Sequence, residues 1–140
     1  MENIILLMCG KNKEKYKTKA KNLYNSERFK LSLEYANTLA NEKNIFILSA
    51  KHGLVELETE LIPYDKSVYD MTIIEKTEWV KMIITKIKSK MNLDIYNFVF
   101  LTDDFYCEYF PQYLKNVEMP LQGLIQSDHI KWFKEKLKKE

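Results

Sequence analysis

Several side chains that could bind or react with a ligand follow an apolar run in the middle of the chain. The run covers residues 44–48, and Ser49, Lys51, His52 and Gly53 come shortly after it. Short apolar runs rich in β-branched and aromatic residues are typical of buried strands, and ligands of open α/β sheets bind at the carboxyl ends of the strands. A hydroxyl, an ammonium, an imidazole and a conformationally free glycine at such an end predict a binding or catalytic site.

Lys51 and His52 are the two ionisable residues of this segment. A lysine at a strand end can bind phosphate, or can act as a base when it is desolvated. His52 could transfer protons near neutral pH, although a histidine in this position could equally do no more than hydrogen-bond to the backbone. The segment therefore predicts where a ligand binds and leaves the reaction open.

A second motif, Pro63-Tyr64-Asp65, lies further along the same connection. Asp65 could orient a water molecule or stabilise a developing cation, or it could close an Asx turn or cap a helix. Tyr64 and Tyr69 could stack on a nucleobase, with aromatic packing as the alternative. Loops as long as residues 51–71 are usually functional in a compact domain.

A third motif follows the first apolar run, residues 4–8, and consists of Cys9, Gly10, Lys11 and Lys13. Glycine and lysine at a strand end could bind phosphate or another anion, although the spacing is neither that of a P-loop nor that of a dinucleotide fingerprint. A solvated, lysine-rich loop is the alternative. Cys9 could act as a nucleophile only if a neighbouring cation stabilises its thiolate, and is otherwise a buried thiol.

Residues 19–26 combine Lys19 and Lys21 with Tyr24. Lysines for phosphate and an aromatic ring for a base suit a nucleotide or a nucleic acid, although such mixtures also arise by chance. The net charge of the chain, +2 over 140 residues, is too small to attract polyanions by itself. An anion site must therefore come from local clusters of this kind.

Composition limits the class of protein. A chain of 140 residues, 46% apolar and 30% charged, fits one ordinary globular domain with one core. Two cysteines give neither a disulfide framework nor zinc-ligand spacing, and we expect no metal and no cofactor. The amino terminus lacks the basic region of a signal peptide, and no run approaches the ~18 apolar residues of a membrane span. We therefore expect a cytoplasmic protein without a membrane partner.

The order of the predicted elements indicates the fold class. Apolar runs predict strands at residues 4–8, 44–48, 96–101 and 117–121. Periodicity and capping residues predict helices at residues 27–43, 72–91 and 127–138, with Ser26 and Thr72 as N-caps and a short helix after Asp104. Residues 11–25 and 51–71 are predicted to be irregular. This order predicts an α/β fold in which residues 1–140 form a single three-layer domain, with a mainly parallel central sheet of about four strands and helices on both faces.

Five segments of the chain carry a resemblance when they are taken in order. They are Cys9-Gly10-Lys11-Asn12-Lys13, Ala20-x-x-Leu23-Tyr24-x-Ser26-x-x-Phe29, Ser49-Ala50-Lys51-His52-Gly53-Leu54, Pro63-Tyr64-Asp65 and Pro120-Leu121-x-Gly123-Leu124. In this order they resemble a family of small prokaryotic and phage proteins catalogued as a domain of unknown function. Its members resemble YaaA-like peroxide-stress proteins and the uracil-DNA-glycosylase-like domain of archaeosine synthase. The resemblance implies a uracil-DNA-glycosylase-like fold and a ligand among nucleobases, 7-deazaguanine-type modified bases or DNA.

The resemblance also distributes roles among the motif residues. The family often has tyrosine at the position of His52, which argues against His52 as an essential catalyst. Catalysis is then expected from Asp65, Lys51 and Tyr64. Substrate or phosphate binding is expected from the remaining motif residues, which are Cys9, Gly10, Lys11, Lys13, Tyr24, Ser49, His52 and Gly53.

Two classes of function follow as expectations. The first is a glycosylase-like hydrolase that cleaves the N-glycosidic bond of a modified base in DNA or in a nucleotide. Some prokaryotic defence proteins are DNA glycosylases that act on modified phage bases, and this extends the first expectation to phage defence. The alternative is a non-enzymatic DNA- or nucleotide-binding protein of the stress response, similar to YaaA. A third expectation is a subunit that associates with a larger base-modifying system.

Overall fold

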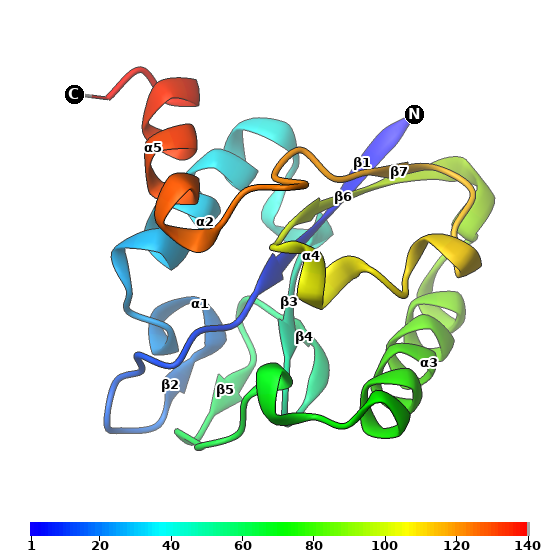
Figure 1. The fold of residues 1–140 in the computed structure, drawn as a ribbon, viewed down its shortest axis with the longest axis horizontal. Helices are drawn as coiled ribbons and strands as arrows, with labels where there is room; N and C mark the ends of the chain where they lie inside the picture. The colour runs from blue at the N-terminus through cyan, green and yellow to red at the C-terminus, as the bar shows by residue number, and fades with distance from the viewer. Residues whose placement is uncertain (140) are drawn as a thin grey trace.

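A mixed five-stranded sheet with the order β4-β3-β1-β6-β7 forms the centre of the computed structural model, which describes residues 1–139 (Figure 1). Its strands are β1 (Glu2–Met8), β3 (Ile45–Ser49), β4 (Gly53–Glu56), β6 (Tyr96–Leu101) and β7 (Val117–Glu118). β1 pairs in parallel with β3 and β6, β7 pairs in parallel with β6, and only β4 runs antiparallel to its neighbour β3. The predicted α/β fold with a mainly parallel sheet is confirmed, and β4 is the strand of this sheet that the prediction missed.

The central strands are apolar at consecutive positions because both of their faces are covered. Residues 4–8 of β1, 45–48 of β3 and 98–101 of β6 are all buried, as expected of parallel strands that lie between two helical layers. One face carries α2 (Glu27–Leu39) and α5 (Gln126–Lys136), and the other carries α3 (Ile73–Lys90) and α4 (Asp104–Cys107) (Figure 1).

The ends of the two long helices follow from local capping. The Ser26 hydroxyl accepts a hydrogen bond from the backbone N–H of Phe29 at the start of α2, and Thr72 forms a capping box with Glu75 at the start of α3. Such caps satisfy backbone donors that have no partner inside the helix. Both predicted N-caps are confirmed. α2 ends at Leu39, earlier than predicted, and a separate 3-10 turn follows it.

The two segments that were predicted to be irregular contain short structured pieces. Within 11–25 and 51–71, two-residue strands form an antiparallel pair, β2 (Thr18–Lys19) with β5 (Glu60–Leu61), and α1 (Ala20–Leu23) follows β2. The remaining short elements are the 3-10 turns η1 (Glu42–Asn44), η2 (Val68–Asp70), η3 (Leu93–Ile95) and η4 (Pro111–Tyr113). A two-residue ladder between distant segments leaves no local periodicity in the sequence, so the pattern could not predict it.

The last strand is shorter than predicted. β7 ends at Glu118, before Pro120, because proline has no backbone N–H to donate to a ladder. Among the described residues, no helix has the length and apolar character needed to cross a membrane.

Candidate functional site

The topology of the sheet identifies the edge at which a ligand would bind. The chain leaves β1 through α2 to reach β3 on one side, and later crosses through α3 to β6 on the other side of β1. Connections from β1 and β6 therefore run in opposite directions, which defines a topological switch point at their carboxyl ends. Open α/β sheets bind ligands in the crevice at this point.

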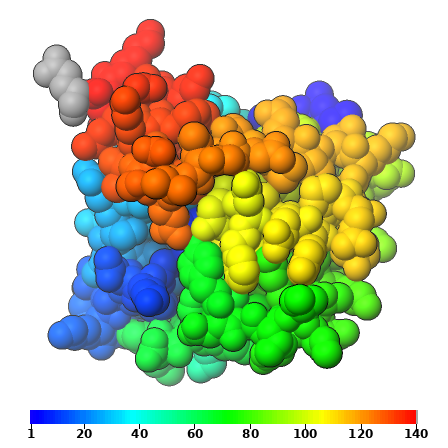
Figure 2. Space-filling model, viewed as in Figure 1, coloured from blue at the N-terminus to red at the C-terminus, as the bar shows by residue number. Residues whose placement is uncertain are grey.

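A cavity of about 490 Å³ lies at the carboxyl end of β1. Its walls come from the end of β1 and the loop after it (residues 8–13), and from the N-cap and first turn of α2 (Ser26, Arg28 and Phe29). Residues 65–67, 69 and 70 and the side chains of Tyr106 and Gln126 complete the lining. Figure 2 shows the face on which the blue, green, yellow and orange segments around this cavity meet. The volume is in the range of sites for small molecules.

Arg28 is the most deeply placed cation of this cavity. It is the only arginine of the chain and has 8% of its surface exposed. Its Nε donates to Nδ1 of His129 at 3.0 Å and its Nη2 donates to the carbonyl of Leu101 at 3.2 Å. Burial lowers the pKa of Arg28 to about 10, opposed by the charge of Asp103, so the guanidinium remains cationic at neutral pH.

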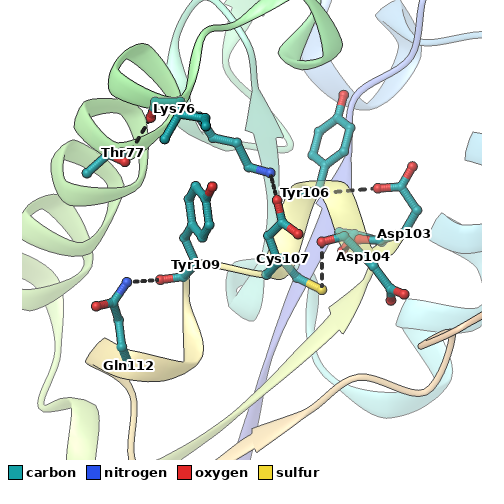
Figure 3. Close-up of polar contacts among 11 residues, drawn as sticks. Lys76, Thr77, Asp103, Asp104, Tyr106, Cys107, Tyr109 and Gln112 are labelled. Carbon is teal, nitrogen blue, oxygen red and sulfur yellow. Dashed lines mark hydrogen bonds and ion pairs between the residues drawn. The ribbon is translucent and has the colours of Figure 1, made fainter.

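Asp103 is a carboxylate whose charge acts on Arg28. It follows β6, and its Oδ1 accepts from the backbone N–H of Tyr106 at 3.0 Å (Figure 3). Its Oδ2 accepts from the Tyr69 hydroxyl, and from Nε2 of Gln126 at 3.2 Å. Burial and the neighbouring Asp103 raise the pKa of Tyr69 above its ordinary value. The carboxylate is thus held by three donors, none of which is Arg28.

Cys9 and Tyr106 form the wall between β1 and α4. The Tyr106 hydroxyl lies 3.1 Å from Sγ of Cys9 and 3.3 Å from its carbonyl oxygen. Both residues are buried, and burial raises the pKa of Tyr106. The hydroxyl therefore keeps its proton, which it can donate to the carbonyl while it accepts from the thiol.

The predicted loop residues Lys11 and Lys13 and the predicted carboxylate Asp65 are brought together at this cavity. Lys13 is half-buried, and burial lowers its pKa while the charges of Cys9 and Asp65 oppose the shift. Its Nζ lies 4.5 Å from the centroid of the Tyr64 ring. Asp65 and Lys11 are exposed, so these two lie at the rim of the cavity, and Gly10 lies between the strand end and Lys11.

A chain of hydroxyls joins three of the predicted residues beside the cavity. The Tyr64 hydroxyl lies 2.7 Å from the hydroxyl of Tyr24 and 2.7 Å from Oγ of Ser49. Burial raises the pKa of Tyr24 to about 12 and also raises that of Tyr64, so both phenols remain neutral donors. Tyr64 and Tyr24 therefore connect the loop after β5 to the segment before α2.

The strand-end motif forms a tight turn. Residues 50–52 connect β3 to the antiparallel β4, and Ser49 pairs with Gly53. Gly53 has φ of +72°, in the left-handed region that glycine adopts without a Cβ penalty. Lys51 and His52 are exposed and do not line the cavity, although the His52 ring contacts that of Tyr64 with centroids 5.4 Å apart.

Sequence reasoning thus located one wall of the cavity and missed its interior. Arg28, Asp103, Tyr106, Tyr69 as a hydrogen-bond donor, and Gln126 were not assigned to the site. One feature of the sequence could have singled out Arg28 as a candidate site residue: it is the only arginine in a chain whose other permanently charged basic side chains are lysines. Among the described residues, no cluster of three histidine, cysteine or acidic side chains is arranged to hold a metal ion.

Fold and site together define an α/β protein with a cationic cavity at the switch point of its sheet. The chain belongs to a family of unknown function (DUF6884), which it matches over residues 4–135. Comparisons with curated proteins and with solved structures gave no match. The predicted membership of an uncharacterised family is confirmed, while the resemblance to YaaA-like and uracil-DNA-glycosylase-like proteins stays a prediction.

Proposed function

We propose that the protein processes nucleobases, as a glycosylase-like hydrolase that cleaves the N-glycosidic bond of a modified base in a nucleotide or in DNA. The observation that carries the proposal is the switch-point cavity, which combines the buried Arg28 with Lys11, Lys13 and Asp65. Cations suit the phosphate of such a substrate, and a carboxylate suits the bond that would break.

Cleavage of an N-glycosidic bond develops positive charge on the sugar. A carboxylate near the sugar can stabilise this charge or orient the attacking water. Asp65 lies at the rim beside Lys13, and Asp103, held by Tyr69 and Gln126, is a second carboxylate near the interior. In this proposal Asp65 serves the reaction, and Lys11 and Lys13 hold phosphate.

The expected roles of Tyr64 and Lys51 change in this proposal. The Lys13 ammonium lies over the Tyr64 ring and the Tyr64 hydroxyl is engaged by Tyr24 and Ser49, so Tyr64 positions Lys13. Lys51 lies in the exposed β3–β4 turn, where it could contact a substrate that extends beyond the cavity, such as DNA.

The five ordered motifs support a more specific relationship. Their resemblance to the uracil-DNA-glycosylase-like domain of archaeosine synthase favours a uracil-DNA-glycosylase-like fold and a base-releasing reaction. A base in a duplex must leave the stack before chemistry can reach it, so single-stranded or damaged DNA would be preferred over intact duplex. Phage defence and association with a larger base-modifying system are consistent with this reaction.

The direct test is release of free base. The protein is incubated with phage DNA that carries modified bases, with single-stranded DNA and with modified nucleotides, and released base is quantified by chromatography. Asp65→Asn should reduce release by about 10²-fold or more, as expected when charge stabilisation is lost. Asp94→Asn is the matched control, because Asp94 is exposed beside the amino end of β6. Absence of release from every substrate would overturn the hydrolase.

The alternative is a non-enzymatic DNA- or nucleotide-binding protein, as the YaaA resemblance implies. The exposure of Lys11, Lys51 and Asp65 favours it, since an exposed carboxylate is less suited to catalysis than a buried one. If phosphate contacts drive DNA binding, the logarithm of the binding constant should fall linearly with the logarithm of salt concentration. Strong salt dependence without base release supports the binder, whereas flat affinity removes phosphate contacts as its basis.

A further inference from the structure

Arg28 has hydrogen-bond donors that the protein does not use. A guanidinium carries five N–H donors, and two of them, one on Nε and one on Nη2, reach His129 and Leu101. The other three have no acceptor among residues 1–139. No fully buried side-chain nitrogen lacks a partner in this part of the chain, so Nη1, which has no partner there, keeps some accessible surface on a residue that lines the cavity.

The charge of Arg28 is also without a direct counterion. No carboxylate of the described chain lies within ion-pair distance of it, although lysines make such pairs with Glu27, Glu34, Glu58 and other acids. Asp103 is the carboxylate whose charge raises the pKa of Arg28 against the effect of burial, and its oxygens are held by Tyr69, Gln126 and Tyr106. A buried cation without a paired anion is costly, and a bound anion would remove that cost.

The orientation of the guanidinium is fixed before any ligand binds. His129 from α5 and the Leu101 carbonyl at the end of β6 hold one edge. The ring of Phe133 lies 5.7 Å from Cζ and supports one side. Held in this way, the free edge forms a rigid fork on a residue that lines the cavity, and such a fork binds an oxyanion through two parallel hydrogen bonds.

We propose that Arg28 is the receptor for a terminal phosphate, and that the ligand of this cavity is a mononucleotide-sized phosphate monoester that enters phosphate first. Identification of the rest of the ligand as a nucleoside rests on the proposed function. A phosphodiester inside a polymer continues in two directions, whereas a receptor that is 92% buried, with 8% of its surface exposed, is reached from one side. Lys11 and Lys13 at the entrance lie where an incoming anion passes.

The single arginine makes the test specific in the unmodified protein. Arginine Nε–H groups give a distinct region of a ¹H–¹⁵N spectrum, and this chain has one such group. The probes are inorganic phosphate, methyl phosphate, dimethyl phosphate and acetate, each at matched ionic strength. Phosphate and methyl phosphate should shift the Arg28 signal with saturation, and dimethyl phosphate should bind at least about tenfold more weakly.

Each departure from this pattern has a defined meaning. An Arg28 signal that does not move with phosphate, or that responds equally to dimethyl phosphate, overturns the proposal. A stronger response to acetate than to phosphate also overturns it, because the receptor would then be one for carboxylate. The four nucleoside monophosphates should bind more tightly than methyl phosphate, and the matching nucleosides should bind more weakly than the monophosphates.

Variants provide an independent check. Arg28→Lys keeps the charge and loses the fork, and should weaken phosphate binding by about tenfold or more. Lys115→Gln is the control, because Lys115 is exposed beside the amino end of β7, and it should bind like the wild type. Since Arg28→Lys could affect folding, its thermal unfolding is measured alongside. If the variant proves to be unfolded, the titration of the wild-type protein alone tests the proposal.

Phosphate binding at Arg28 and release of free base are measured independently, so the failure of one proposal can be distinguished from the failure of the other. A saturable Arg28 response without base release supports the phosphate receptor and overturns the hydrolase. Base release from DNA by a protein whose Arg28 signal ignores phosphate overturns the receptor and supports the hydrolase.

Discussion

Nε of Arg28 donates a hydrogen bond to Nδ1 of His129 at 3.0 Å and so connects α2 to α5 across 101 positions of the chain. Since Nδ1 accepts, the single proton of the neutral imidazole lies on Nε2, which donates to the carbonyl of Leu124 at 3.2 Å. Protonation of Nδ1 would break the first bond and place two cations side by side. The geometry thus requires neutral His129.

Acid should therefore destabilise the protein through His129. Burial and the charge of Arg28 lower the pKa of His129 below its ordinary 6.5. Below about pH 6.5 the unfolded chain binds a proton that the folded chain does not, so stability is fully present above this pH and falls as the pH decreases toward the folded pKa. Urea unfolding measured stepwise between about pH 7.5 and pH 5 should show this loss.

The variant His129→Asn tests whether His129 causes the fall of the free energy of unfolding in acid. The Asn oxygen can accept from Arg28 without titrating, so this variant should lose less stability in acid than the wild type. The pKa of His52 is also lowered, by burial and by Lys51, and His52→Asn measures that second contribution. If the free energy of unfolding falls equally with pH in His129→Asn and in the wild type, His129 is not the cause of the loss.

The hydroxyl chain beside the cavity should contribute to stability through its middle member. Tyr64→Phe removes the group that lies 2.7 Å from both Tyr24 and Ser49 and leaves the buried Tyr24 hydroxyl without this partner. We expect a loss of about 1–3 kcal/mol in the free energy of unfolding, measured by urea denaturation. Tyr35→Phe is the control, because Tyr35 is half-buried and its hydroxyl has no partner among the described residues; an equal loss there would contradict the prediction.

The strands and caps could be predicted because their signals are local. Residues 4–8 and 98–101 are buried on both faces, and consecutive apolar positions record that burial directly. Ser26 and Thr72 cap helices through donors only three residues away. Signals within one turn or one strand need no knowledge of the rest of the chain.

The interior of the site could not be predicted because its contacts are distant in sequence. Arg28 follows a helix cap and would be solvated in an isolated helix. It is buried because residues of α5 and the end of β6 pack over it. Similarly, the turn after Ser49 depends on pairing with β4, whose apolar run of Leu54 and Val55 is too short to identify a strand.

Lys76 of α3 forms an ion pair with Glu108, the residue that follows α4. Figure 3 shows the Lys76 side chain extending from α3 toward α4. Lys76 is 2% exposed, and its Nζ lies 2.5 Å from the Glu108 carboxylate and 3.6 Å from the centroid of the Phe105 ring. Glu108→Gln should cost about 1–3 kcal/mol in the free energy of unfolding, because it leaves a buried ammonium without its counterion. Lys76→Met should cost less than about 1 kcal/mol, because Met fills the same space and the partly exposed Glu108 can turn toward water.

Urea unfolding of the two variants measures this asymmetry. A greater loss in Lys76→Met than in Glu108→Gln would show that the pair contributes net stability through the lysine, contrary to the prediction. Glu118→Gln, at the exposed position of β7, controls for the loss of a surface carboxylate. Glu118 accepts a hydrogen bond from Asn97, which the amide oxygen of Gln can also accept.

Gly53 should tolerate alanine less well than Gly123, although both have positive φ. A Cβ at Gly53, where φ is +72°, would lie 2.7 Å from Cε of Met82, whereas a Cβ at Gly123, where φ is +82°, meets no atom within 4 Å. Both alanine variants incur the backbone cost of about 1–2 kcal/mol, and only Gly53→Ala adds a contact that Met82 must relieve. Chemical denaturation should give a larger loss for Gly53→Ala. In a Met82→Ala background the two losses should become equal, and a persistent difference would show that the β3–β4 turn is constrained by something other than α3.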